Sequence, residues 1–214
     1  MSASKLKLVN LGLPKSGTTT LAYALEQAGW LCADHKVRRS IPQSGKLGGA
    51  YIGRMVYRGY FETGDPFHYL GFYDALTEIN ILHKHLTFWP QCDHAVIQAM
   101  RRCHPDLRFV VTHRPAENLS DSMQRWGNLG SVRLPNGAIP GLPYGFGGDD
   151  AERIRWIEGH YAMLRDIFAG DVRFLELHMD APDAKEKLAA HLGLDLPWWG
   201  KKNVNEKTPA KGAA

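Results

Sequence analysis

Apolar and polar positions at the start of the chain follow first a strand pattern and then a helix pattern. Residues 5–11, KLKLVNL, combine alternation with an apolar run that ends at Gly12, which is typical of a buried strand. The positions that then recur at helical spacing are Leu21, Leu25 and Ala28. Gly29 supplies a helix stop, and WLCAD (30–34) indicates a second short strand. The order strand, loop, helix, strand is the opening of an α/β domain with a parallel sheet.

The rest of the chain continues this alternation of helices and strands. Further strands are expected at GFYDALTEI (71–79), LRFVVTH (107–113) and DVRFLEL (171–177). Helices are expected from residue 50 to Gly64, over 93–103 with Asp93 as the cap, from Pro115 onward, over 154–168 and over 183–192. The pattern predicts a single domain over residues 1–205, with a central parallel sheet flanked by helices in three layers.

Two of these helices carry more detailed expectations. The helix that Pro115 opens is expected to have one apolar face, made by Leu119, Met123 and Trp126. The last helix is expected to begin with a capping box formed by Asp183 and Glu186.

Two segments interrupt the pattern, and one follows it. Residues 36–72 combine a loop-like start with a helix, and residues 127–150 are rich in glycine and proline without periodicity. A loop as long as 127–150 in a compact domain is usually a lid, a binding loop or a disordered segment. We expect both segments to be insertions that form a lid or shape a ligand site. Residues 206–214 are small and polar, so we expect a flexible tail.

Composition narrows the function classes. The 214 residues carry a formal charge of +4, which favours an anionic ligand but is too small and dispersed to indicate nucleic-acid binding. Three cysteines without paired spacing indicate free thiols in a reducing compartment. The polar start is unlike a secretory signal peptide, and no apolar run approaches the roughly 18 residues of a membrane span. We therefore expect a cytoplasmic protein.

The stretch LGLPKSGTTTL (11–21) has the form of a phosphate-binding loop whose lysine is displaced. The common pattern G-x-x-x-x-G-K-[ST] has its lysine directly after the second glycine. Gly12 and Gly17 keep that separation, but Thr18 stands at the lysine position and Lys15 lies inside the loop. Backbone N–H groups at a helix start, together with this lysine, predict an anion site. The hydroxyl groups available there belong to Ser16, Thr18, Thr19 and Thr20. An ordinary strand-to-helix turn is the alternative.

A second group of candidate residues lies in THRPAENLSDSMQRW (112–126), a stretch that begins at the end of the strand 107–113. Arg114 comes at the carboxyl end of that strand, where ligands of parallel sheets bind. Ser122 lies eight positions later, about two turns along the helix. Arginine and serine can then reach one phosphate, the arginine by a forked, charge-assisted contact. The alternative is a surface arginine and a helix serine that are neighbours by chance.

Together, PKSGTT after the first strand and the spacing of Arg114 and Ser122 resemble the sulfotransferases that use 3′-phosphoadenosine-5′-phosphosulfate (PAPS). The resemblance implies a P-loop-like α/β fold. It also implies a 5′-phosphosulfate site made by Lys15, Ser16, Gly17, Thr18 and Thr19, and a 3′-phosphate site made by Arg114 and Ser122. HPDLRFVVTHRP (104–115) is similar to the family's approach to its arginine. KNVN (202–205) is similar to the closing segment of short bacterial members, which approaches the cofactor.

The resemblance implies in-line transfer of a sulfuryl group to a hydroxyl or amine. Lys15 would stabilise charge on the leaving phosphate, and the acceptor needs a base. Glu78 is the first candidate base, Asp74 the second, and His35 is a third. No metal is expected, because His83 and His85 are more often solvated or packed than ligands at such a spacing. Cations lie near aromatics within 36–72, and a partly packed helix with a solvated basic face is the favoured interpretation. If these cations line the acceptor site instead, they indicate a small-molecule or saccharide acceptor of anionic character.

Two other function classes stay open from the residues. A P-loop kinase using ATP and magnesium would want lysine at position 18, where this chain has threonine. A non-catalytic nucleotide-binding module of the same fold would bind the nucleotide without turnover. Binding of ATP with magnesium tests the first, and loss of rate on mutation of Lys15 tests the second.

Overall fold

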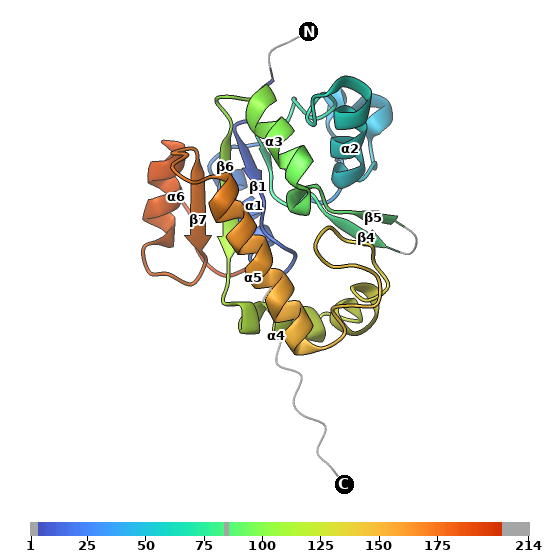
Figure 1. Cartoon of the computed structure of the whole chain (residues 1–214). Helices are drawn as coiled ribbons and strands as arrows, with labels where there is room; N and C mark the ends of the chain where they lie inside the picture. The colour runs from blue at the N-terminus through green and yellow to red at the C-terminus, as the bar shows by residue number, and fades with distance from the viewer. Residues whose placement is uncertain (1–3, 84–85, 203–214) are drawn as a thin grey trace.

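Short apolar segments form a parallel sheet at the centre of the molecule (Figure 1). The computed structural model describes residues 4–83 and 86–202. The sheet strands are β1 (Leu8–Asn10), β2 (Cys32–Ala33), β3 (Ala75–Leu76), β6 (Arg108–His113) and β7 (Phe174–His178). They are hydrogen-bonded in the order β2-β3-β1-β6-β7, and every pairing is parallel. The expected α/β class with a parallel sheet is confirmed.

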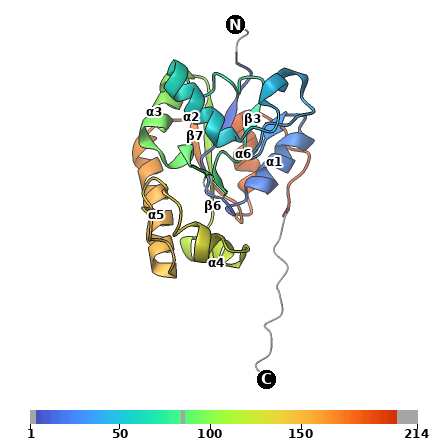
Figure 2. The same ribbon diagram turned by 90° about the vertical axis from the view of Figure 1, so that its right-hand side faces the viewer.

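Helices cover both faces of this sheet, because successive strand residues point to opposite sides. Val9 packs in a core with α2 (Ile52–Thr63), α3 (His94–Cys103) and α5 (Asp150–Ile167). Leu8, one residue earlier, packs in a second core with α1 (Thr18–Gln27) and α6 (Ala184–Leu192). Figure 2 shows α3 and α5 on one side of the sheet and α1 on the other. The three expected layers are therefore present.

The strand order places a crevice at the carboxyl end of β1. The strands β2 and β3, which come next in the sequence, lie on one side of β1, and the later strands β6 and β7 lie on the other side. Ligands of open parallel sheets bind where the strand order reverses in this way. The helix α4 (Ala116–Arg125) lies beyond this edge, below the strand ends in Figure 1.

Several elements differ from the pattern-based expectation. The strands β2 and β3 are two residues each, much shorter than 30–34 and 71–79. An antiparallel hairpin of β4 (Ile81–His83) and β5 (Leu86–Phe88) was not expected. Within the two expected loops lie the 3₁₀ segment η1 (Pro42–Leu47) and the π-helical segment η3 (Leu129–Arg133), and η2 (Pro90–Cys92) is a further 3₁₀ turn. The expected tail, 206–214, lies outside the described residues.

The observed helix ends confirm one expectation from the sequence and contradict two others. Asp93 caps α3 as expected, since its side chain accepts from the N–H groups of Ala95 and Val96. The predicted inward position of Trp126 is wrong: α4 ends at Arg125, and the Trp126 side chain is 41% exposed. The predicted capping box at Asp183 is also wrong, because its side chain makes no cap hydrogen bond. Its carboxylate lies 2.9 Å from Lys187 Nζ instead.

Membrane-spanning character can be judged from the helices themselves. Among the described residues, no helix combines the length and the apolarity that crossing a bilayer requires.

Candidate functional site

The loop after β1 is held by a small buried network of polar groups. The N–H of Gly12 donates to Asn10 Oδ1 over 2.9 Å, and the Asn10 side chain also binds Thr112 on β6. The hydroxyls of Ser16 and Thr112 lie 2.6 Å apart. A Cβ on Gly12 would overlap Thr112 Oγ1, so only glycine fits where the loop passes β6. The network fixes the loop against the carboxyl end of the adjacent strand.

The loop backbone then takes two left-handed residues before α1. Lys15 has φ of 71°, the only positive φ of a non-glycine residue in the described chain, and Gly17 has φ of 117°. Such a conformation is uncommon for lysine, and backbone strain of this kind clusters at functional sites. The Lys15 carbonyl accepts a hydrogen bond of 3.2 Å from Arg114 Nη1. The loop and the end of β6 are therefore joined by the two residues expected to bind anions.

A cavity of about 530 Å³ opens at this edge of the sheet. Most of the residues expected from sequence line it, namely Lys15, Ser16, Gly17, Thr18, Thr19, His35, Glu78, Arg114 and Ser122. These come from the loop, the ends of β2, β3 and β6, and α4. A volume of this size suits a small-molecule or cofactor ligand.

The hydroxyl residues of the loop are not equivalent. The Ser16 side chain is fully buried, and its hydroxyl donates to the Leu13 carbonyl over 2.6 Å while also touching Thr112. Its hydroxyl thus holds the loop together. Thr18 donates to Glu78, and the hydroxyl of Thr20 accepts from the N–H of Lys202 over 3.1 Å. Thr19 is the exposed member of the set.

Glu78 is an acidic group that contacts the loop. Its Oε2 accepts a 3.0 Å hydrogen bond from Thr18 Oγ1, and Asn80 Nδ2 lies 3.4 Å from its Oε1. Burial raises the pKa of Glu78, and the hydrogen bond from Thr18 opposes that rise. Burial also lowers the pKa of Lys15, while the Glu78 charge raises it and the Arg114 charge lowers it. A carboxyl and an amine with pKa values shifted by burial in one cavity are typical of a functional site.

The other two candidate bases lie in different environments. Asp74 precedes β3 at the amino end of the strand, where its carboxylate lies 2.9 Å from Lys7 Nζ and accepts from the N–H of Leu31. Asp74 is therefore outside the cavity, and the expectation that it could serve there is wrong. His35 does line the cavity, and its hydrogen bond with Asp34 raises its pKa.

The cavity also has a cationic and aromatic wall that the sequence did not indicate. Lys15 Nζ lies 5.0 Å from the centre of the Trp126 ring, and Arg133 Cζ lies 4.8 Å from it. Arg133 also donates to the Leu82 carbonyl of β4 over 3.3 Å. Trp126 directly follows α4, and its indole lies within cation–π distance of both cations. The exposed aromatic is thus part of the site.

The carboxyl-terminal segment returns to the same loop. Gly200, Lys201 and Lys202 line the cavity. Lys202 Nζ lies 3.9 Å from the centre of the Tyr23 ring, and Lys201 Nζ lies 3.2 Å from Asp180. The remaining residues of the KNVN segment, 203–205, lie outside the described residues. Cations from the loop, the end of β6, α4, η3 and the carboxyl-terminal segment therefore line the cavity and favour an anionic ligand.

Comparison with known proteins does not assign the chain to a family. No protein-family model matches the chain, and no curated protein matches it.

Proposed function

We propose that the protein transfers a sulfuryl group from PAPS to a hydroxyl or amine of an acceptor. The observation that carries the proposal is the contact between Arg114 and Lys15 at one cavity, which unites two anion-binding elements. A strand order with β1 between β3 and β6, and the loop directly after β1, favours a P-loop-like fold. PAPS has anionic groups at both ends of a ribose and therefore matches a site with two such elements.

The residues divide naturally between the two anionic ends. Backbone N–H groups at the start of α1, with Lys15, would bind the 5′-phosphosulfate, because a helix amino terminus and a cation both favour negative charge. Arg114 would bind the 3′-phosphate by a forked contact, with Ser122 beside it. Ser122 is buried on α4 and lines the cavity.

Transfer requires that the acceptor loses a proton as its oxygen or nitrogen bonds to sulfur. The bond from sulfur to the 5′-phosphate oxygen breaks, and Lys15 stabilises the charge left on that phosphate. Glu78 is the base that we assign, because it lies in the cavity, accepts a hydrogen bond from Thr18 of the loop, and has a pKa that burial raises. The products are the sulfated acceptor and 3′,5′-adenosine bisphosphate.

The cavity wall suggests the chemical class of the acceptor. Arg125 and Arg133 line the cavity beside Trp126 and the hairpin residues. A guanidinium binds carboxylates and sulfates by paired hydrogen bonds, and an indole face packs against a sugar ring or another flat group. An anionic small molecule or acidic saccharide fits this wall.

Calorimetric titration with 3′,5′-adenosine bisphosphate tests the proposal directly. We expect binding by the wild-type protein, and Arg114→Ala should weaken it by about 10- to 150-fold, corresponding to about 1.5–3 kcal/mol for hydrogen bonds to a charged group. The matched control is Arg155→Ala, which removes an exposed arginine of α5 outside the cavity. That variant should bind like the wild type.

Two results would point to the other function classes. Binding of ATP with magnesium, without binding of the bisphosphate, would refute the sulfotransferase and favour a kinase. Once an acceptor is found, Lys15→Ala separates an enzyme from a binding module: an enzyme should lose rate by about 100-fold or more, because a pre-organised charge at the leaving group contributes several kcal/mol.

A further inference from the structure

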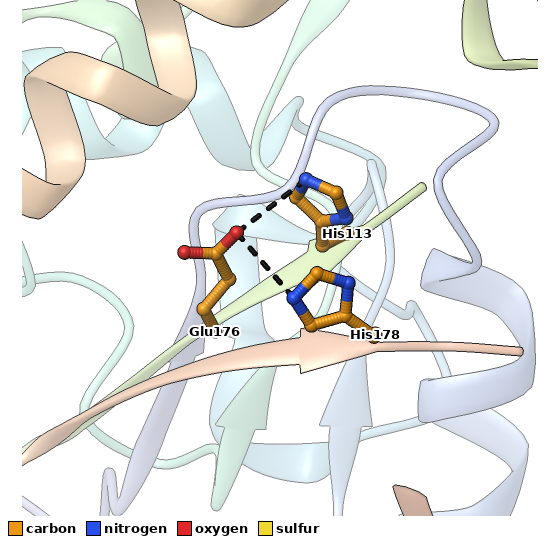
Figure 3. A group of neighbouring side chains, drawn as sticks. All are labelled: His113, Glu176 and His178. Carbon is orange, nitrogen blue, oxygen red and sulfur yellow. Dashed lines mark ion pairs between the residues drawn. The ribbon is translucent and has the colours of Figure 1, made fainter. Parts of the chain in front are cut away.

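Two histidines and a glutamate meet at the carboxyl ends of β6 and β7, beside the candidate site. His113 Nε2 lies 3.4 Å from Glu176 Oε1, and His178 Nε2 lies 3.7 Å from the same oxygen. The three ligand-type atoms all lie within 4.8 Å of one another. Figure 3 shows both imidazoles turned toward the one carboxylate oxygen.

The strand register explains why these residues meet. His113 and His178 are directly paired in the parallel ladder of β6 and β7, so their side chains lie on the same face of the sheet. Glu176 precedes His178 by two residues and therefore also points to that face. The face is the one that α5 covers, where Tyr161 packs 4.2 Å from the His113 ring, measured between centroids. Backbone geometry therefore holds all three side chains on one surface.

We propose that His113, His178 and Glu176 bind a divalent transition metal of the zinc class. Two imidazoles and one carboxylate are a frequent ligand set for Zn²⁺ and related ions, with the remaining position taken by water. Tetrahedral ligands at the usual bond lengths of about 2.0–2.1 Å are about 3.3 Å apart, and the two His–Glu separations of 3.4 and 3.7 Å are near this value. The ligand atoms of the two imidazoles lie within 4.8 Å of each other.

Arg165 on α5 supplies the outer support that such a carboxylate needs. Its Nε donates to Glu176 Oε2 over 2.8 Å, and its second nitrogen reaches Oε1 over 2.5 Å. A bound metal takes Oε1 and displaces that second contact, while the bond to Oε2 keeps the carboxylate oriented. His178 is 55% exposed in its side chain, which leaves an entry path from solvent.

The metal would join the two strands that carry cavity residues. Arg114 directly follows His113, and Met179 directly follows His178; both line the cavity. The N–H of Met179 already donates to the His113 carbonyl over 3.2 Å. This site is separate from the anion cavity, and the proposal does not depend on the sulfotransferase assignment.

The test is metal titration of the tag-free, full-length protein after removal of bound metal with a chelator. We expect one equivalent of Zn²⁺ by calorimetry, and visible d–d absorption of four- or five-coordinate character when Co²⁺ replaces it. His178→Ala should weaken Zn²⁺ binding by at least about tenfold. This variant should fold normally, because the imidazole that it removes is half exposed.

The matched control is His68→Ala, which removes an exposed histidine far from β6 and β7 in sequence. Retained Zn²⁺ affinity in His68→Ala together with loss in His178→Ala supports the site. Equal affinity of wild type and His178→Ala, or no uptake of Zn²⁺ by the wild type, overturns it.

Discussion

At the scale of single residues, Gly12 is a position where the site leaves no space for a side chain. Its missing side chain lets the loop pass Thr112 and Ser16, whose hydroxyls an added Cβ would overlap or approach to 2.8 Å. Gly12→Ala should therefore destabilise the protein by about 1–3 kcal/mol, because overpacking displaces buried partners. Urea unfolding measures the change.

A glycine in open surroundings provides the control for that substitution. Gly159 lies inside α5, and a Cβ there would meet nothing within 4 Å. Gly159→Ala should stabilise the protein by about 0.5–1 kcal/mol, since alanine favours the helix. If the two variants had equal stability, close packing around Gly12 would not be what requires glycine there.

The charge state of Glu78 gives a second prediction at this scale. Its raised pKa means that the folded protein binds the proton more tightly than the unfolded chain does. The stability that this group contributes is therefore greatest below the unfolded-state pKa, near 4.3, and falls as pH rises through the raised value. Glu78→Gln has no charge to bury, so its stability relative to wild type should increase with pH.

Unfolding free energies of both proteins between about pH 4.5 and 8 test this expectation. The exposed Glu158 on α5 supplies the control, because Glu158→Gln removes a carboxylate outside the cavity. A constant difference between Glu78→Gln and wild type across this range would show that Glu78 is not desolvated.

At the scale of elements, long periodic segments were predictable and short ones were not. The strand β6 and the helix α5 were identified because several buried positions repeat at one period. Each of β2 and β3 has only two ladder residues, too few to distinguish a strand from its flanks. Asp74 was misplaced for this reason: a nine-residue strand would put it mid-strand, whereas β3 begins after it.

Trp126 shows a different limit of element prediction. Its spacing from Leu119 and Met123 continues the helical period, but the backbone leaves the helix at this residue with φ of −88° and ψ of 84°. No residue pattern before it marks that end. The three residues of the proposed metal site were missed because strand pairing, which joins positions 65 residues apart in sequence, brings His113 to His178.

At the scale of the whole molecule, the cavity exists only when distant parts of the chain are folded together. Lys15, Glu78, Arg114 and Lys202 come from the first loop, the end of β3, the end of β6 and the carboxyl-terminal segment. The sequence indicated the loop and Arg114 because each follows a recognisable strand. It could not indicate the cationic wall, which depends on how η3 and the hairpin fold over the sheet edge.

One buried histidine makes the stability of this folded arrangement depend on pH. His160 on α5 donates from Nε2 to the carbonyl of Leu11, at the start of the loop, over 2.8 Å. Its other ring nitrogen, Nδ1, is buried without a hydrogen-bond partner among the described residues. Protonation would therefore place a charge and an unsatisfied donor in the core, and burial lowers the pKa of His160 to about 4.

The consequence is a loss of stability on mild acidification. A histidine whose pKa falls from 6.5 to about 4 on folding contributes stability that is fully present above pH 6.5 and declines as the pH falls toward 4. The whole decline corresponds to about 3 kcal/mol. His160→Gln can keep the bond to the Leu11 carbonyl but does not titrate, so it should lose less stability between about pH 7.5 and 5. Urea unfolding of both proteins at these two pH values measures the difference. Parallel losses in the two proteins would mean that other groups control the acid response, and that the contact between α5 and the loop is insensitive to pH.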